Sequence, residues 1–269
     1  MEKDIVISSI HTPNADISTN HCHNGYQIIY VFNGEAELKV GSKTYDILKH
    51  CIIFISNLEL HSVTPIGEEY RSLSLLLSPK KLDNAIHNQT LLSVFNNRPP
   101  HFDHCIDVTA IHEKVEQILL KLHEETKEES AYSDELSICL IKELLIELYR
   151  YDKKMFPNYD KGIVNVVWKV RCYIEENCTK DIKVNEIAEM FYSNIYYLSH
   201  CFKTTTGYSI KQYILLCRLA LAREFLYNSN SNVTEICFKA GFSDINNFIR
   251  YFKREVGVTP TEYRKNINR

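Results

Sequence analysis

The first part of the chain, to about Leu77, alternates between short apolar runs and turn-forming residues. Four runs rich in β-branched, aromatic and aliphatic residues are typical of strands: Tyr26–Phe32, Ala36–Val40, Cys51–Ile55 and Leu73–Leu77. Turn-forming residues separate them at Asn33-Gly34, Gly41-Ser42, Ser56-Asn57 and Pro65–Gly67. Because an Asn-Gly pair between two apolar runs is a strong hairpin signal, we expect a tight turn at Asn33-Gly34. Strands at this spacing predict a small sandwich or barrel.

From about Ser78 to Tyr151 the apolar positions recur with the period of a helix. One set runs from Ile111 to Leu122 and another from Leu136 to Leu148. We therefore expect two amphipathic helices, Thr109–Thr126 and Ser133–Arg150, which could pack on the barrel or form a homodimer contact. Pro157 and Gly162 then interrupt the pattern. These breaks predict an N-terminal domain of residues 1–151, a linker of residues 152–163 and a C-terminal domain of residues 164–269.

The C-terminal domain contains one pattern twice. Asn194–Gly207 and Asp244–Gly257 both carry an apolar residue, three further residues, Phe-Lys, three more residues and Gly. Each copy follows a shorter amphipathic segment, Val184–Phe191 in the first and Val233–Ala240 in the second. Two short helices joined by a tight turn form a helix-turn-helix unit. The sequence therefore predicts two such units, with Ser209–Tyr227 as one long connecting helix.

Local chemistry sets the expected ends and faces of these helices. Asn194 and Ser243 are suitable N-caps, and Gly207 and Gly257 can take the left-handed conformation that ends a helix. The helical spacing assigns Leu198, Phe202, Phe248 and Phe252 to the core. It leaves ten residues facing outward: Ile195, Tyr196, Ser199, His200 and Lys203 in the first copy, and Ile245, Asn246, Ile249, Arg250 and Lys253 in the second.

These outward faces suit the major groove of DNA. Arg250 can pair with guanine and Asn246 with adenine, and Ile and Tyr side chains can contact thymine methyl groups. Lysines on the same faces can hold phosphates. A rigid connector could place the two recognition helices in successive groove segments, about 34 Å apart. The alternative is a plain helical bundle that binds no nucleic acid.

The charge distribution favours the DNA interpretation. The whole chain has a formal net charge of −3, but the part from Val164 onward has 15 Lys and Arg against 10 Asp and Glu. That part is therefore net +5, and the remainder is net −8. A basic region joined to an acidic one indicates that the basic region meets a polyanion.

Other features narrow the class of protein. No apolar stretch approaches eighteen residues and the N-terminus lacks the pattern of a signal peptide, so we expect a cytoplasmic protein with no membrane partner. The nine scattered cysteines form no CxxC pair, and we expect reduced, buried thiols such as Cys139 and Cys217. Neither a GxSxG motif nor a phosphate-binding glycine loop occurs, so we expect no enzyme activity.

The second unit, Ile236–Arg264, resembles the signature region of the AraC/XylS-type bacterial transcription regulators. The residues that match are Gly241-Phe242-Ser243, Phe248, Arg250, Phe252-Lys253, Gly257, Thr259-Pro260 and Tyr263-Arg264. The sequence departs from the usual pattern at Cys237, where Ala is common, and at Asn194-Ile195, where Ser-Pro is common. The resemblance implies binding to promoter DNA, activation of transcription through contact with RNA polymerase, and a cupin-like N-terminal domain.

The N-terminal domain carries a histidine pattern. His21-Cys-His23, followed by Gln27 and Gly34, resembles the first cupin motif, and His61 follows a predicted strand. In metal-dependent cupins this set holds iron, manganese or zinc, but Gln27 in place of Glu removes a charge and weakens the metal interpretation. The resemblance to the regulators implies instead a pocket for a small effector. We therefore predict an effector site without metal or cofactor, formed by His21, His23, Gln27, Tyr30 and His61.

The sequence thus predicts an α+β protein of two domains. An N-terminal cupin-like β-barrel with a helical hairpin precedes an all-α tandem helix-turn-helix domain. The predicted function is that of a homodimeric, sequence-specific transcription regulator, an activator that responds to a small molecule such as a sugar. Two alternatives stay open: a metal-dependent cupin enzyme with a DNA-binding tail, and a constitutive regulator whose barrel has no ligand.

Overall fold

The computed structural model describes residues 6–11, 21–41, 43–96, 98, 102–127, 130–157 and 163–267. The chain groups into two compact units, the first built mainly from residues up to Tyr159 and the second mainly from those after it. Gly162 of the predicted linker lies outside the described residues. The first unit combines a sheet with helices and the second is helical, so the expected α+β class is confirmed.

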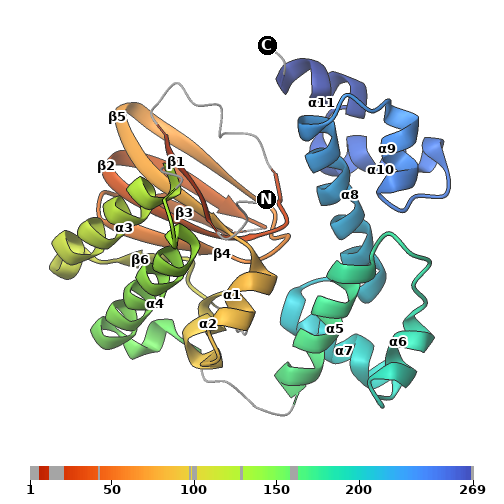
Figure 1. Cartoon of the computed structure of the whole chain (residues 1–269), viewed down its shortest axis with the longest axis horizontal. Helices are drawn as coiled ribbons and strands as arrows, with labels where there is room; N and C mark the ends of the chain where they lie inside the picture. The colour runs from red at the N-terminus through yellow and green to blue at the C-terminus, as the bar shows by residue number, and fades with distance from the viewer. Residues whose placement is uncertain are drawn as a thin grey trace. The chain divides into compact units, whose positions relative to one another are not determined.

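Six strands in the described part of the chain form one antiparallel sheet, which curls into a half-barrel (Figure 1). The strands are β1 (Val6–His11), β2 (Tyr26–Val40), β3 (Lys43–Ile47), β4 (Cys51–Ile55), β5 (His61–Leu77) and β6 (Cys105–Asp107). Their order is β1-β5-β2-β4-β6, and β3 pairs with the second half of β2. The sequence pattern missed β1, β3 and β6, which are short.

The two faces of the sheet bury different cores. In the first half of β2, Tyr26 and Ile28 contact the cluster that includes the helices, whereas Ile29 and Val31 contact the inner cluster of the half-barrel. This alternation follows from the two-residue period of a strand. In the second half of β2 the inner positions become even-numbered, as at Leu38. The change falls where the register with β5 shifts twice, between Val31 and Asn33 and between Asn33 and Glu35.

The expected hairpin at Asn33-Gly34 is wrong, because β2 continues through these residues. Asn33 pairs with Arg71 and Glu35 pairs with Ile66, so the register shifts on both sides of Gly34. Gly34 has a positive φ of 79°, and a Cβ there would lie 2.6 Å from the Cα of Tyr70. The glycine therefore serves a bulge and a close backbone approach instead of a turn. The expected turn at Pro65–Gly67 likewise lies inside β5.

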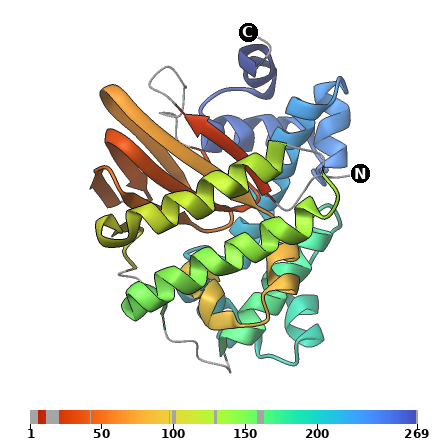
Figure 2. The same ribbon diagram turned by 60° about the vertical axis from the view of Figure 1, so that its left-hand side comes forward.

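The helices of the first unit pack on the outer face of the sheet. They are α1 (Pro79–Ala85), α2 (Gln89–Asn96), the short 3-10 helix η1 (Thr109–Ile111), α3 (His112–Lys127), α4 (Ser133–Tyr151) and the 3-10 helix η2 (Lys153–Met155). Figure 2 shows α3 and α4 side by side, and the two helices contact each other. Their apolar faces join the outer core, as expected. Cys139 of α4 is exposed, which corrects the expectation of a buried thiol, because it lies outside the buried stripe.

Seven helices make up the described part of the second unit. They are α5 (Ile163–Asn177), α6 (Val184–Met190), α7 (Ile195–Thr206), α8 (Ile210–Asn228), α9 (Val233–Lys239), α10 (Ile245–Val256) and α11 (Pro260–Ile267). In Figure 1, α5, α6 and α7 surround one end of α8, and α9, α10 and α11 surround its other end. Among the described residues, no helix combines the length and the apolar character that a membrane span needs.

We predict that Gly34→Ala lowers the free energy of unfolding by roughly 2–4 kcal/mol, because it adds both left-handed strain and a clash with the backbone of Tyr70. Gly67→Ala is the matched control, since Gly67 has a positive φ of 77° but no atom within 4 Å of the added Cβ. It should cost only about 1 kcal/mol. Urea unfolding of both variants, followed by circular dichroism, measures the difference. Equal losses would contradict a close approach at Gly34.

Candidate DNA-reading surface and ligand site

The two helix-turn-helix units repeat in structure as they do in sequence. In α7, Leu198 and Phe202 are buried, and in α10 Phe248 and Phe252 take the equivalent buried positions. Both helices end at a glycine in the left-handed conformation, as expected from the sequence. The two helices therefore present equivalent outward faces.

The N-terminal ends of the two recognition helices are capped by different residues. The Asn194 side chain caps α7 by accepting hydrogen bonds from the backbone N–H groups of Tyr196 (2.9 Å) and Tyr197 (3.3 Å). For α10 the expected cap, Ser243, is wrong. Asp244 caps it instead, accepting from the N–H of Asn247 at 2.7 Å. The cap moves by one residue because the turn between α9 and α10 is one residue longer than the turn between α6 and α7. The helix dipole also favours a carboxylate at a helix N-terminus.

The long helix α8 carries both units. It begins with a capping box in which Ser209 and Gln212 exchange hydrogen bonds with each other's backbone. It contacts α5 and α7 on the side of the first helix-turn-helix unit, and α9 and α11 on the side of the second. Because it has neighbours on both sides, its buried residues do not form a single stripe: Ile210, Tyr213, Ile214, Leu216, Cys217, Leu219, Ala220, Ala222 and Leu226.

Two contacts join the connector α8 and the second helix-turn-helix unit to the loop that follows α5. From α8, Arg218 donates hydrogen bonds to the backbone oxygens of Cys178 (2.6 Å) and Lys180 (2.8 Å). In the turn of the second unit, Gly241 lies so close to the same loop that a Cβ would come within 2.5 Å of the Cα of Thr179. Since both contacts end on backbone atoms, they hold the two units at a set spacing.

The turn of the first unit differs at the position equivalent to Gly241. Tyr192 stands there and adopts the same left-handed backbone, with φ of 49°. Its side chain is 100% exposed, so it makes no packing contact that offsets the strain. Glycine is required at position 241 because the backbone of Thr179 leaves no room for a side chain. At position 192 the tyrosine side chain is fully exposed to solvent.

The outward residues predicted from the sequence separate into two groups. Six are exposed: Tyr196, His200, Lys203, Asn246, Arg250 and Lys253. The other four are half-buried: Ile195, Ser199, Ile245 and Ile249. Ile245 and Ile249 also pack against the core of the second unit, which leaves only part of each side chain for another molecule. Arg250 donates a hydrogen bond to the side chain of Asn247 at 2.8 Å and lies over the ring of Tyr251.

Sequence reasoning missed two exposed aromatic residues on the first helix-turn-helix unit. Tyr192 in the turn and Tyr197 on α7 lie in the same stretch as Tyr196, and all three are exposed. Tyr197 comes directly before buried Leu198, so helical spacing alone could have placed it off the core. The left-handed turn at Tyr192 has no signal in the sequence, because glycine is the residue expected there.

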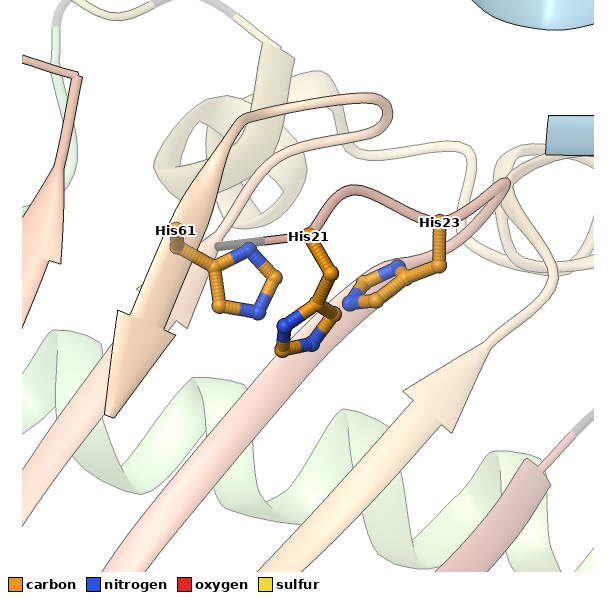
Figure 3. Close-up of side chains that lie close together, drawn as sticks. All are labelled: His21, His23 and His61. Atoms are coloured by element: carbon orange, nitrogen blue, oxygen red, sulfur yellow. The ribbon is translucent and has the colours of Figure 1, made fainter. Parts of the chain in front are cut away.

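Three of the predicted effector-site residues are histidines whose ring nitrogens lie close together. His21 and His23 lie on the segment that leads into β2, and His61 begins β5 (Figure 3). One ligand nitrogen from each ring lies within 4.8 Å of the others. The segment is held where it enters the strand, because Gly25 donates its backbone N–H to the Asn57 side chain at 2.8 Å.

His61 is 1% exposed and has a fixed orientation. Its Nδ1 lies 2.8 Å from the backbone oxygen of Glu59, and a carbonyl can only accept, so Nδ1 carries the proton. Glu59 is itself held by Arg98 (2.5 Å) and His104 (2.9 Å). Burial disfavours the Glu59 carboxylate, but Arg98 and His104 outweigh it and hold the pKa of Glu59 below its usual range. With the proton on Nδ1, the Nε2 atom of His61 carries the lone pair of the ring.

The other two predicted effector-site residues lie on opposite faces of β2. Gln27 shares the face of Ile29 and donates a hydrogen bond to the Ser74 hydroxyl at 2.7 Å. Tyr30 belongs to the outer core, where its hydroxyl donates to Glu116 at 2.8 Å. Burial and the Glu116 carboxylate raise the pKa of the Tyr30 hydroxyl. The structure thus separates Tyr30 from the three histidines.

A hollow of about 680 Å³ lies on the unit that contains the sheet. It is lined by β6 and by the segment around η2, with Phe102, Asp103, Asp107, Asp152, Lys154 and Met155 among the lining residues. Its volume falls in the range of small-molecule sites. Several charged side chains line it, and it does not include the histidines.

A tandem helix-turn-helix unit joined to a half-barrel is the architecture of a ligand-responsive transcription regulator, and comparison with known families gives the particular class. Residues 2–145 match the model of the AraC-like ligand binding domain. Residues 187–266 match the model of a helix-turn-helix domain. The chain therefore belongs to the AraC family of transcription regulators.

Curated relatives and solved structures extend over nearly the whole chain. The chain is 23% identical to the HTH-type transcriptional activator RhaS of Escherichia coli O139:H28 (strain E24377A / ETEC) over 254 residues, which cover 94% of this chain and 89% of RhaS. It is 21% identical to the HTH-type transcriptional activator RhaR of Salmonella schwarzengrund (strain CVM19633) over 251 residues, covering 93% and 88%. Among solved structures, ToxT from Vibrio cholerae has a TM-score of 0.69 at 16% identity, covering 97% of this chain and 98% of that one. Unsaturated fatty acid bound ToxT has a TM-score of 0.68 at 13% identity, covering 98% and 97%. The ToxT structures share the fold of this chain.

We predict that Gly241→Ala lowers the free energy of unfolding of the helical unit, α5 to α11, by at least about 2 kcal/mol. The loss comes from left-handed strain and from the clash with Thr179. Tyr192→Gly, at the equivalent turn position, should leave stability unchanged or raise it by up to about 1 kcal/mol, because it removes the strain. Trp168 of α5 is the single tryptophan of the chain, so its fluorescence during urea unfolding reports on the helical unit that contains both helix-turn-helix units. A Gly241→Ala variant as stable as the natural protein would contradict the close approach.

Proposed function

We propose that this protein activates transcription from promoter DNA in the cytoplasm, as a homodimer that responds to a small polar effector. The observation that carries the proposal is the pair of equivalent recognition helices, α7 and α10, held by one buried connector. Their exposed residues include hydrogen-bonding and cationic side chains, as base and phosphate contacts require. The family match and the two curated activators support the same function.

The contacts to DNA divide into specific and general ones. Arg250 and Asn246 are exposed on α10 and have the donor and acceptor groups that distinguish base pairs. Lys203 and Lys253 take equivalent places on the two helices and suit phosphate oxygens. On α7, Tyr196 and His200 give the first unit a different surface, with Ile195 and Ser199 beside them. On α10, Ile245 and Ile249 offer their exposed parts to thymine methyl groups.

The helix pair α3 and α4 is the proposed homodimer contact. Leu120 and Ile146 are exposed apolar residues on these two helices, outside the core that covers the sheet. Burying such side chains against a second copy would remove apolar surface from water. The proposed contact with RNA polymerase rests on the activators to which the chain is similar.

The proposed effector site combines His21, His23, Gln27 and His61. Imidazole and amide groups donate and accept hydrogen bonds, and such groups recognise the hydroxyls of a sugar. Tyr30 is left out of this site, because its hydroxyl is engaged on the other face of β2. ToxT binds an unsaturated fatty acid, but the groups gathered here are polar and suit a hydroxylated ligand better.

We predict that Arg250→Ala weakens binding to the preferred promoter site by roughly 1–3 kcal/mol and leaves binding to unrelated DNA unchanged. Lys253→Ala, one turn along the same helix, is the matched control and should weaken binding to all sequences alike. It should also reduce the salt slope of the binding constant by about one. Fluorescence anisotropy with promoter fragments at several salt concentrations measures both effects. Binding without salt dependence or sequence preference would contradict the proposal.

We predict that one member of a sugar panel raises the melting temperature of the full-length protein, since a ligand at 100 times its Kd stabilises by about 2.7 kcal/mol. His21→Ala should abolish the shift, because it removes one hydrogen-bonding group from the site. Lys154→Ala alters the separate hollow near β6 and should keep the shift. A shift lost in Lys154→Ala and kept in His21→Ala would place the effector in the hollow. No shift with any sugar would favour a constitutive regulator.

A further inference from the structure

The first helix-turn-helix unit carries large exposed side chains around its turn. Met190 ends α6, Tyr192 stands in the turn and Tyr196 lies near the start of α7, and these side chains are 50%, 100% and 84% exposed. Tyr197, the next residue on α7, is 53% exposed. Single exposed apolar residues are ordinary on a protein surface, whereas a group of them marks a contact with another molecule. Tyrosine and methionine are also among the residues enriched in such contacts.

The second helix-turn-helix unit lacks this aromatic surface, although its backbone repeats the first. The equivalent positions are Lys239 at the end of α9, Gly241 in the turn, and Asn246 and Asn247 near the start of α10. None of these four residues is aromatic. The two helices and the turn therefore form without the tyrosines, so the helix-turn-helix fold does not require them.

The backbone of the first turn is fixed by two hydrogen bonds. The N–H of Tyr192 donates to the backbone oxygen of Glu189 at 3.1 Å, and the N–H of Ser193 donates to that of Ala188 at 2.9 Å. The φ of Tyr192 is 49°, a conformation that glycine adopts at lower cost. Since the tyrosine side chain is fully exposed, it lowers the stability of the free protein relative to glycine.

The general geometry of helix-turn-helix binding locates this turn on DNA. The first helix of such a unit crosses the DNA backbone, and the N-terminal residues of the second helix contact base edges in the major groove. The turn joins these two parts, so it lies where the groove meets a sugar–phosphate strand. Tyr192 comes three residues before Ile195, the first residue of α7, so their Cα atoms are at most about 11 Å apart. The turn thus stays within the groove width of about 12 Å.

We propose that Tyr192 contacts the sugar–phosphate strand beside the groove that α7 enters. Its hydroxyl donates a hydrogen bond to a phosphate oxygen, and its ring packs on the adjoining sugar. Met190 and Tyr196 flank it and extend the covered surface. The proposal rests on the function proposed above, because it takes α7 to be a recognition helix.

The charges near the turn favour a contact through a neutral side chain. The neutral Asn194 caps α7, and the first turn of that helix has no acidic residue that would repel a phosphate. On α6 the carboxylate of Glu189 is exposed and disfavours a phosphate beside that helix, so the contact falls on the turn and on α7. Because tyrosine is uncharged, its contact releases no counterion from the DNA. A contact to the backbone also carries no direct sequence information. Tyr192 should therefore strengthen binding to every sequence and leave the salt slope unchanged.

The test uses the full-length protein and its Tyr192→Gly and Tyr192→Phe variants. Fluorescence anisotropy on promoter fragments and on unrelated DNA, at several salt concentrations, measures binding. We expect Tyr192→Gly to weaken binding to both kinds of DNA by at least roughly tenfold, the loss of a hydrogen bond to a charged group, with the same salt slope. It should do so although the variant is at least as stable as the natural protein. Tyr192→Phe loses the hydrogen bond and keeps the ring, so its affinity should fall between the two.

Tyr132→Gly is the matched control. Tyr132 also has a left-handed backbone, with φ of 64°, and a side chain that is 78% exposed, but it precedes α4 in the unit that contains the sheet. Its replacement removes comparable strain and the same side chain, and it should leave DNA binding unchanged.

Two results would overturn the contact. One is a Tyr192→Gly variant that binds DNA as tightly as the natural protein. The other is a variant that binds DNA normally but no longer activates transcription, because the aromatic surface would then meet a protein. Natural protein that shows no salt-dependent DNA binding would instead refute the proposed function, so the two failures are distinguishable.

Discussion

The burial of α8 along its length is the constraint on which the whole DNA-binding unit depends. One half of this helix packs on α5 and α7, and the other half packs on α9 and α11. A helix of 19 residues is a stiff rod of roughly 28 Å, so both recognition helices inherit their spacing from it. Arg218 and Gly241 then fasten the second unit to the backbone after α5. These contacts set the spacing between the two recognition helices.

The sequence predicted the helical half of the fold well and the sheet less well. Tandem repeats, caps and a 3.6-residue period are local signals, and they placed α3, α4 and α6 to α10 within a few residues. Asn33-Gly34 misled because the same dipeptide that makes a tight turn also makes a bulge. The choice between the two depends on Tyr70, which packs against Gly34 from 36 positions along the chain. Such a nonlocal contact leaves no trace in a window of neighbouring residues.

The candidate ligand site shows the same division. The spacing of His21 and His23 and the position of His61 after a strand were enough to group three residues that the structure brings together. Tyr30 is different, because Gln27 and Tyr30 are an odd number of residues apart on one strand. The two-residue period of a strand assigns them to opposite faces, so the separation was available from the sequence. What no sequence pattern shows is that Arg98 and His104, from distant segments, hold Glu59, whose backbone oxygen orients His61.

The unequal turns at Tyr192 and Gly241 have a consequence for how this regulator can diverge. Any side chain at position 241 would collide with Thr179, so the turn of the second reader tolerates one residue type. Position 192 has no such neighbour and already accepts the large side chain of tyrosine. The turn of the first helix-turn-helix unit can therefore vary in sequence, while the turn of the second is confined to glycine.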